Sequence, residues 1–167
     1  MQYKIFRYFA YSLEMIIFFV LDRTPIMMLD FWSNRASLLV PIVFMIALFE
    51  GEEVGVSFGV FAGILLDSSV GYSWGFFVIL LGILGYIIGL ISRDIINVTF
   101  LTAMLVCAVA TVVFFIFSFF YYNFAQRYQN AWYIFWRHYL IKIAFGLLTL
   151  PIVYYLNRPL AINLNEQ

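Results

Sequence analysis

The chain has 167 residues, of which 65% are apolar, 22% are aromatic and only 11% are charged, and its nine acidic residues balance nine lysine and arginine residues. A soluble domain carries about 45 to 50% apolar and roughly 25% charged residues, so the surplus apolar surface is expected to face lipid. The neutral balance excludes a basic nucleic-acid-binding surface. The length allows a single integral membrane domain over residues 1–167.

Six apolar runs predict a bundle of six transmembrane helices, because a bilayer core about 30 Å thick needs about 20 apolar residues per helix. The first run, Ile5 to Leu21, has no signal-peptide cleavage site after it and is expected to be retained. The second and third, Ala36 to Phe49 and Val54 to Leu66, are short and predict a hairpin around the turn Glu50-Gly51-Glu52-Glu53. The remaining spans are predicted at Gly71 to Ser92, Val98 to Tyr122 and Trp136 to Leu156.

The positive charges give no orientation for this bundle. With six spans, four lysine or arginine residues fall on the side of both termini and four on the other side, whereas an orientation requires an excess on one side. The longer connections, residues 22–35 and 123–135, mix aromatic and polar residues, which is typical of the membrane surface. They predict short interfacial elements.

A row of glycines occurs at every fourth residue in and around the third helix. Residues four apart lie on one helix face, so this row predicts a ridge along which another helix backbone can approach closely. The ridge serves either packing within this chain or docking of a transmembrane helix from another protein. Its members, with the one aspartate in the same register, are Gly51, Gly55, Gly59, Gly63, Asp67, Gly71 and Gly75. The next helix continues the theme with Gly82, Gly85 and Gly89.

Asp67 ends an apolar run, where a carboxylate faces the negative end of the helix dipole and needs compensation. It could cap the amides that begin the next helix, together with Ser68 and Ser69, or it could contact a partner protein. Glu52 and Glu53 open the third helix, where negative charge is favoured and a solvated first turn explains them. Both functions remain open for Asp67.

Gly71-Tyr72-Ser73-Trp74-Gly75 fits the G-x-S-x-G pattern of a nucleophilic serine. That pattern requires a preceding strand and a base, yet the preceding residues are helical and the one histidine is His138. An intramembrane serine hydrolase is therefore a remote alternative. We expect no catalytic, metal or cofactor-binding residues.

Glu14 and Lys142 are the two charges that lie deepest in the predicted spans. An acid at such a depth is costly unless it is neutralised or paired. We predict that Glu14 faces the bundle interior and pairs with Lys142, holding the first helix to the last. The alternative is that Lys142 extends to the membrane surface and Glu14 is protonated or hydrated.

The chain resembles the rod-shape-determining MreD family in several features. They are Arg35, Leu38-Leu39, an acidic turn, Gly59, Gly63, Asp67, Gly71 and Gly75, with Pro151 in the final helix. The resemblance covers essentially the whole chain and is most specific over residues 35–90. Ala36 stands where the family commonly has proline, and the turn with Glu50, Glu52 and Glu53 is acidic where the family's is often basic.

This resemblance implies a non-catalytic scaffold in the bacterial inner membrane with both termini in the cytoplasm. It implies membership of the elongasome, which organises lateral peptidoglycan synthesis and cell shape. It also implies binding to MreC and, indirectly, to RodA with a class B penicillin-binding protein and to the MreB filament. Membrane lipids are expected partners, and a homo-oligomer stays open.

The family fold is similar to the vitamin-binding S components of energy-coupling-factor transporters. A small-molecule-binding transporter component is therefore the alternative function. Such a component is expected to carry polar residues that converge on a pocket, and the sequence has few in its predicted spans.

Overall fold

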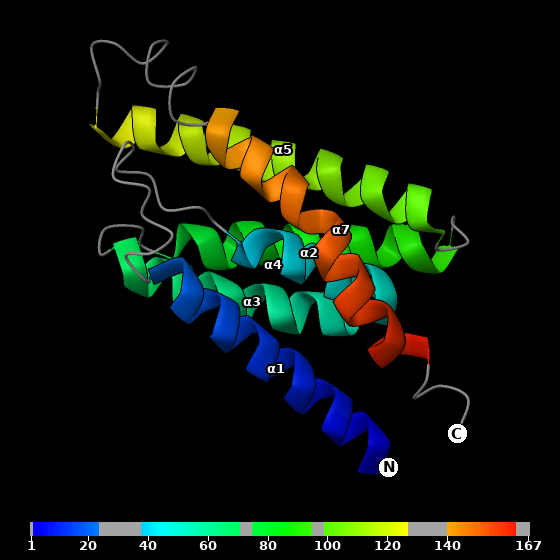
Figure 1. The fold of residues 1–167 in the computed structure, drawn as a ribbon. Helices are drawn as coiled ribbons and strands as arrows, with labels where there is room; N and C mark the ends of the chain where they lie inside the picture. Colours follow the sequence, from blue (N-terminus) through cyan, green and yellow to red (C-terminus); the bar gives the residue numbers. More distant parts are fainter. Residues whose placement is uncertain (1, 24–37, 71–74, 95–98, 127–139, 163–167) are drawn as a thin grey trace.

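The computed structural model describes residues 2–23, 38–70, 75–94, 99–126 and 140–162, which form six α-helices and no strand. The helices are α1 (Gln2–Arg23), α2 (Leu39–Glu50), α3 (Glu52–Val70), α4 (Phe76–Asp94), α5 (Phe100–Gln126) and α7 (Leu140–Ile162). Consecutive helices run in opposite directions, so the start of α1 and the end of α7 lie at the same end of the bundle (Figure 1). The all-helical class and the order of six helices are thus confirmed for the described part of the chain. Most of the two predicted interfacial segments lies outside it.

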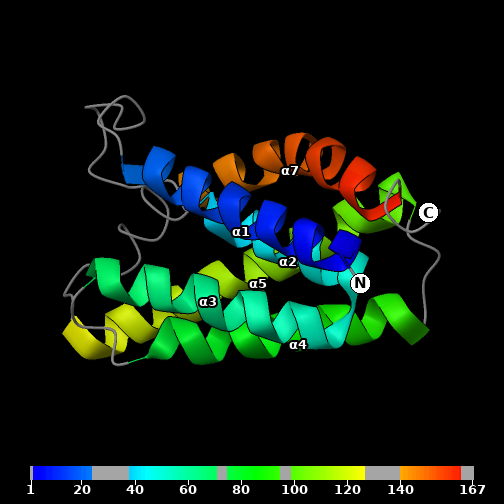
Figure 2. The same ribbon diagram turned by 90° about the horizontal axis from the view of Figure 1, so that it is seen from below.

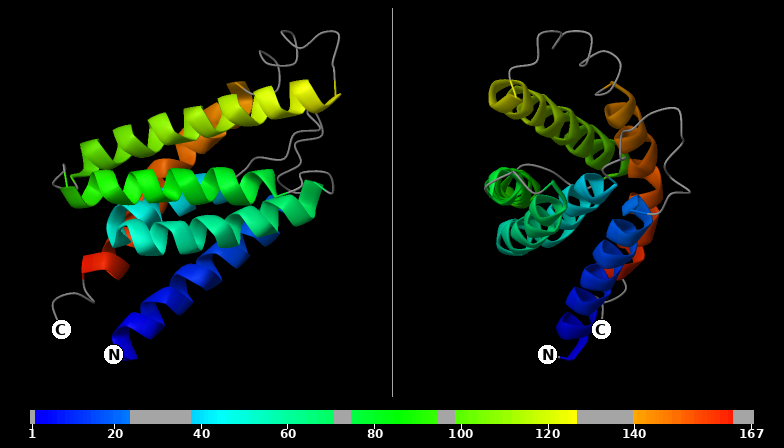
Figure 3. Two further views of the ribbon diagram at one scale, coloured as in Figure 1. Left: turned by 180° about the vertical axis from the view of Figure 1, so that it is seen from behind. Right: turned by 90° about the vertical axis from the view of Figure 1, so that its left-hand side faces the viewer.

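Helix α2 forms the centre of the bundle. All ten residues from Leu39 to Leu48 are buried, and α2 contacts each of the five other described helices. Helices α1 and α7 cover one side of α2, while α3 and α4 cover the other (Figures 2 and 3). A helix that is hydrophobic on every face is stable only inside a protein or a membrane. Its 12 residues span about 18 Å, so α2 serves as the core around which the longer helices pack.

The predicted hairpin is present, but its second helix is longer than the apolar run indicated. Helix α3 begins at Glu52, one residue after Gly51, and continues beyond the predicted end at Leu66 to Val70. Ser68 is accommodated in this last turn because its hydroxyl donates to the carbonyl of Leu65 at 2.8 Å. Asp67 therefore lies inside α3 and not at its end.

The outer surface of the bundle is apolar along most of the helices. Two helices, at Phe76–Arg93 and Phe100–Tyr121, are long and apolar enough to cross a membrane. Large side chains on several helices remain strongly exposed, among them Phe9 (64%), Ile79 (64%) and Leu101 (75%). Monomeric soluble proteins rarely expose continuous apolar surface on this scale. The surface is suited to lipid or to the apolar helices of a membrane protein.

Helix α7 contains Pro151 and Pro159 and curves along one side of the bundle (Figure 3). Proline removes a helical hydrogen bond and favours bending. Tyr154, in the same helix, packs edge-on against Phe100 of α5, with their ring centroids 5.0 Å apart. This contact fixes the end of α7 to the start of α5.

Candidate functional site

The glycine ridge of α3 is filled by α4 of the same chain. A Cβ atom added to Gly59 would lie 2.5 Å from the carbonyl oxygen of Leu81, and one added to Gly55 would lie 2.6 Å from that of Gly85. A Cβ on Gly63 would collide with the backbone of Val78. These three glycines therefore pack α3 against α4, and their face is not free to receive a helix from another protein.

The glycines of α4 complete this contact from the other side. A Cβ on Gly85 would collide with the backbone of Gly55, and one on Gly89 would collide with the backbone of Glu52. Gly82 is less constrained, because its Cβ would meet only the Cγ2 atom of Val60, at 3.3 Å. The two helices thus approach backbone to backbone, as small residues on facing helices allow.

The ends of the predicted ladder have a different role. Gly51 and Gly75 have φ angles of 90° and 80°, and no atom lies within 4 Å of a Cβ added at either position. Positive φ is the reason for glycine there, since side chains disfavour it. Gly51 joins α2 to α3 and Gly75 precedes α4. The prediction of one continuous ridge was wrong at these two positions, and Gly71 lies outside the described residues.

Asp67 caps the start of α4. The backbone N–H groups of Phe77 and Val78 donate to its Oδ1 and Oδ2 atoms, each at 3.3 Å. These N–H groups belong to the first turn of a helix, where no carbonyl of the same helix is available to them. Of the two functions considered for Asp67, the structure thus supplies the cap. Ser68 takes no part in it, since its hydroxyl bonds within α3.

The end of α2 carries a buried ion pair. Arg7 of α1 lies 2.6 Å from Glu50 Oε2, and both side chains are more than nine-tenths buried. The hydroxyl of Tyr11 donates to Glu50 Oε1 at 2.9 Å. Glu50 is the last residue of α2, where the helix dipole disfavours negative charge. Arg7 compensates for that position and joins α1 to α2.

A second ion pair, between Glu52 and Arg93, lies close to Glu50 and links α3 to α4. Glu52 accepts from the guanidinium group of Arg93, and Ser92 donates to the carbonyl of Leu48 at the end of α2. The pKa of Glu52 lies below its ordinary value because its own backbone N–H bonds to the carboxylate and because Arg93 also bonds to it. Glu52 is therefore not merely solvated, whereas Glu53 is exposed.

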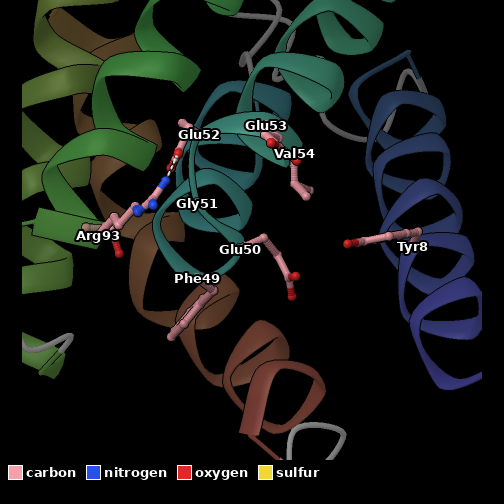
Figure 4. Close-up of a pocket in the computed structure, with 9 residues that line it drawn as sticks. Tyr8, Phe49, Glu50, Gly51, Glu52, Glu53, Val54 and Arg93 are labelled. Carbon is pink, nitrogen blue, oxygen red and sulfur yellow. Dashed lines mark hydrogen bonds and ion pairs between the residues drawn. The ribbon is translucent and has the colours of Figure 1, made fainter. Parts of the chain in front are cut away.

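These groups surround a pocket of about 420 Å³ at this end of the bundle (Figure 4). In Figure 4, Tyr8 extends from α1 toward Glu50, and Arg93 meets Glu52 on the far side. The pocket is lined by Tyr8, Phe49, Glu50, Gly51, Glu52, Glu53, Val54, Ser92 and Arg93. The hydroxyl of Ser92 is engaged by a carbonyl and not by a base. The pocket therefore offers charge and hydrogen bonding without an activated nucleophile.

The predicted ion pair between Glu14 and Lys142 is wrong. Asn157 of α7 donates to Glu14 Oε1 at 3.2 Å, and Lys142 interacts with Asp22 near the end of α1. Because α1 and α7 run in opposite directions, the start of α7 and the end of α1 lie at the same end of the bundle (Figure 1). Lys142 is 15 residues from Asn157, which corresponds to about 22 Å along a helix. That separation is too large for Lys142 to reach Glu14.

The remaining candidate groups are a serine with its possible base, the cysteine and any cluster of metal-binding side chains. Ser73 and His138 lie outside it, so the G-x-S-x-G hypothesis has no geometry to support it. Cys107 is fully buried in α5. Among the described residues, no three His, Cys, Asp or Glu side chains gather where they could hold a metal ion.

The buried link between Arg7 and Glu50 was not predicted. Two features of the sequence pointed toward it: an acid at the end of an apolar run and an arginine within the first apolar run. Both are costly alone, so each requires a partner. The sequence did not show that the partner lay 43 residues away. Asn157 was missed for a similar reason, since one asparagine late in an apolar helix has no periodic pattern.

Comparisons with protein-family models, curated proteins and solved structures found no match to this chain.

Proposed function

We propose that this chain is a non-catalytic scaffold of the bacterial inner membrane, with six spans and both termini cytoplasmic, that acts in the manner of MreD. In this proposal it binds the transmembrane helix of MreC and helps to organise lateral peptidoglycan synthesis in the elongasome. Its mechanism is placement by helix packing. RodA with its class B penicillin-binding protein, and the MreB filament, are then indirect partners.

The observation that carries the proposal is the distribution of apolar side chains. Helices α1, α4, α5 and α7 all expose large apolar residues outward, whereas the ten residues of α2 from Leu39 to Leu48 are all buried. A bilayer admits helices because each satisfies its own backbone hydrogen bonds. The outward residues can therefore contact lipid or a neighbouring transmembrane helix without further polar groups.

The α2–α3 hairpin supports the specific resemblance to MreD. Gly59 and Gly63 pack closely on α4, and Asp67 one turn later caps the same helix. The glycines and the aspartate that carry the resemblance thus act together as one unit that holds α3 to α4. Such a unit gives the scaffold a rigid half.

The glycine ridge cannot be the surface that binds MreC, because α4 already covers it. We assign MreC binding to the outward apolar faces. A Gly59→Leu variant would therefore damage the packing of α3 on α4, and loss of MreC from that variant would not identify a direct contact.

The decisive experiment is affinity purification of the tagged full chain from mild detergent, followed by mass spectrometry. The host is the bacterium that encodes the chain, and an unrelated tagged six-span protein provides the control. We expect MreC to be recovered with the chain and not with the control, and depletion of the chain to convert rods into spheres. Recovery without MreC, together with unchanged cell shape, would disprove the proposal.

The pocket at the turn favours the second candidate, a small-molecule-binding component similar to transporter S components. Its volume of about 420 Å³ lies within the range of about 300 to 1,000 Å³ that is usual for ligand sites. It opens at the helix ends beside Glu53, which is exposed. Copurification of a transporter's ATPase subunits in place of MreC would support this candidate.

A further inference from the structure

Glu14 and Asn157 form a polar contact between the first and last helices. Asn157 is fully buried, and its Nδ2 atom donates to Glu14 Oε1 at 3.2 Å. The neighbouring buried side chains on the two helices are Tyr11, Met15, Val153 and Tyr154. The contact thus lies among largely apolar groups, where polar atoms need partners within the protein.

The orientation of the Asn157 amide is fixed by a second hydrogen bond. Its Nδ2 atom also donates to the carbonyl of Val153, at 3.0 Å. An amide NH₂ group has two donors, and both are now used. The reversed amide would place Oδ1 against the Val153 carbonyl, so the amide is held with Nδ2 toward its two acceptors and with Oδ1 away from the Val153 carbonyl.

Two acceptors at this contact have no donor. Glu14 Oε2 and Asn157 Oδ1 are both buried and make no hydrogen bond within the described part of the chain. A planar carboxyl group and a planar amide group that share one N–H···O bond can form a second hydrogen bond when the remaining oxygens of the two groups face each other and one of them carries a proton. A single proton can therefore satisfy both atoms.

No positive charge in the described residues neutralises Glu14. Arg7 lies two turns away and binds Glu50, Lys142 interacts with Asp22, and the exposed Arg158 lies over the ring of Tyr154. Helix α3 presents Phe58 to Tyr11 of α1 at this level. The ionisable side chains that α1, α2 and α7 carry in this region are Arg7, Tyr8, Tyr11, Glu50, Tyr154, Tyr155 and Arg158.

We propose that Glu14 and Asn157 form a proton-binding site, in which Glu14 Oε2 carries a proton and donates it to Asn157 Oδ1. The proton comes from a hydronium ion of the solvent: one of its O–H bonds breaks as an O–H bond forms on the carboxyl group, and a water molecule is left. The acid and the amide then make two parallel hydrogen bonds that fasten α1 to α7. This site goes beyond the proposed function and does not depend on it, because it concerns the contact between α1 and α7 and not the outward faces assigned to MreC.

The proposal predicts that glutamine can replace the protonated acid. In Glu14→Gln, the side-chain oxygen still accepts from Asn157 and the new NH₂ group donates to Asn157 Oδ1. Thermal unfolding of the full chain in detergent should therefore give the same midpoint for wild type and Glu14→Gln at about pH 4, where Glu14 is protonated in the unfolded chain as well. As the pH rises from there, the wild type should lose stability relative to the variant, because the unfolded chain releases a proton that the folded chain must keep.

Infrared spectroscopy tests the proton directly. At neutral pH the wild type should show the carbonyl stretch of a protonated carboxylic acid that Glu14→Gln lacks, and the Asn157→Leu variant should shift that band. Identical wild-type and Glu14→Gln spectra in this region would overturn the proposal, as would a wild-type midpoint that is independent of pH. If Glu14→Gln does not fold, Glu14→Asp replaces it: a shifted acid band supports the site, and an unchanged band refutes it.

Discussion

The two halves of this bundle are held together by different chemistry. Helices α3 and α4 meet through glycine backbones, with no side chain between Gly55 and Gly85. Helix α1 is attached by polar side chains instead, through Arg7 to Glu50 on α2 and through Glu14 to Asn157 on α7. The stability of the glycine contact should depend little on charge and strongly on any added side-chain volume. The stability of the polar attachment should depend strongly on charge and less on added volume.

The largest effect is expected at the buried ion pair of α1. Replacing Arg7 with methionine leaves the Glu50 carboxylate buried without its cation, which typically costs about 3 to 5 kcal/mol of unfolding free energy. Thermal or denaturant unfolding in detergent measures this loss. The double variant Arg7→Met, Glu50→Gln should recover more than half of it, because the stranded charge is removed.

Failure of the double variant to recover would contradict this explanation and would assign the loss to packing of the arginine stem. Leu13→Met provides a control on an exposed site of the same helix. It should change the free energy of unfolding by less than about 0.5 kcal/mol.

The second prediction tests the glycine contact by adding one methyl group. Gly59→Ala places a Cβ 2.5 Å from a backbone carbonyl, and such overpacking costs about 2 to 3 kcal/mol. Gly82→Ala meets only a side-chain methyl of Val60, while alanine improves helix propensity by up to about 1 kcal/mol. We expect Gly82→Ala to remain within about 1 kcal/mol of wild type. Equal losses of unfolding free energy in the two variants would contradict this explanation, because the close backbone contact at Gly59 would then be no more sensitive to an added methyl group than the looser contact at Gly82.

The two halves differ in how well the sequence predicted them, because one depends on local sequence patterns and the other on contacts between residues far apart in the chain. The six helices and the close face of α3 were predictable, because apolar run length and a spacing of four are local patterns. Gly51 and Gly75 have the same spacing as the packing glycines, so periodicity assigned them to the ridge. Their positive φ angles depend on where the chain turns, which the spacing does not reveal.

The polar attachment of α1 was less predictable because it depends on register between distant helices. The sequence showed that Glu14 needed a partner, and Lys142 was the deepest cation on the last helix. The antiparallel packing places Asn157 there instead, and Lys142 near Asp22. A buried carboxyl group can take a neutral donor as well as a cation, so the requirement for a partner did not identify it.

The smallest of the three effects is expected at Asp67, which belongs to the glycine half but acts through hydrogen bonds. Asp67→Ala removes both acceptors from the amides of Phe77 and Val78, and loss of a helix cap costs about 1 kcal/mol. Asp67→Asn keeps one acceptor oxygen but loses the favourable charge at the helix start, so it should fall between alanine and wild type. Ser68→Ala, at an exposed neighbour with no cap bond, should be nearly silent in the same unfolding assay. If Asp67→Ala were as silent as Ser68→Ala while MreC copurification fell, Asp67 would contribute to partner binding and not to the cap.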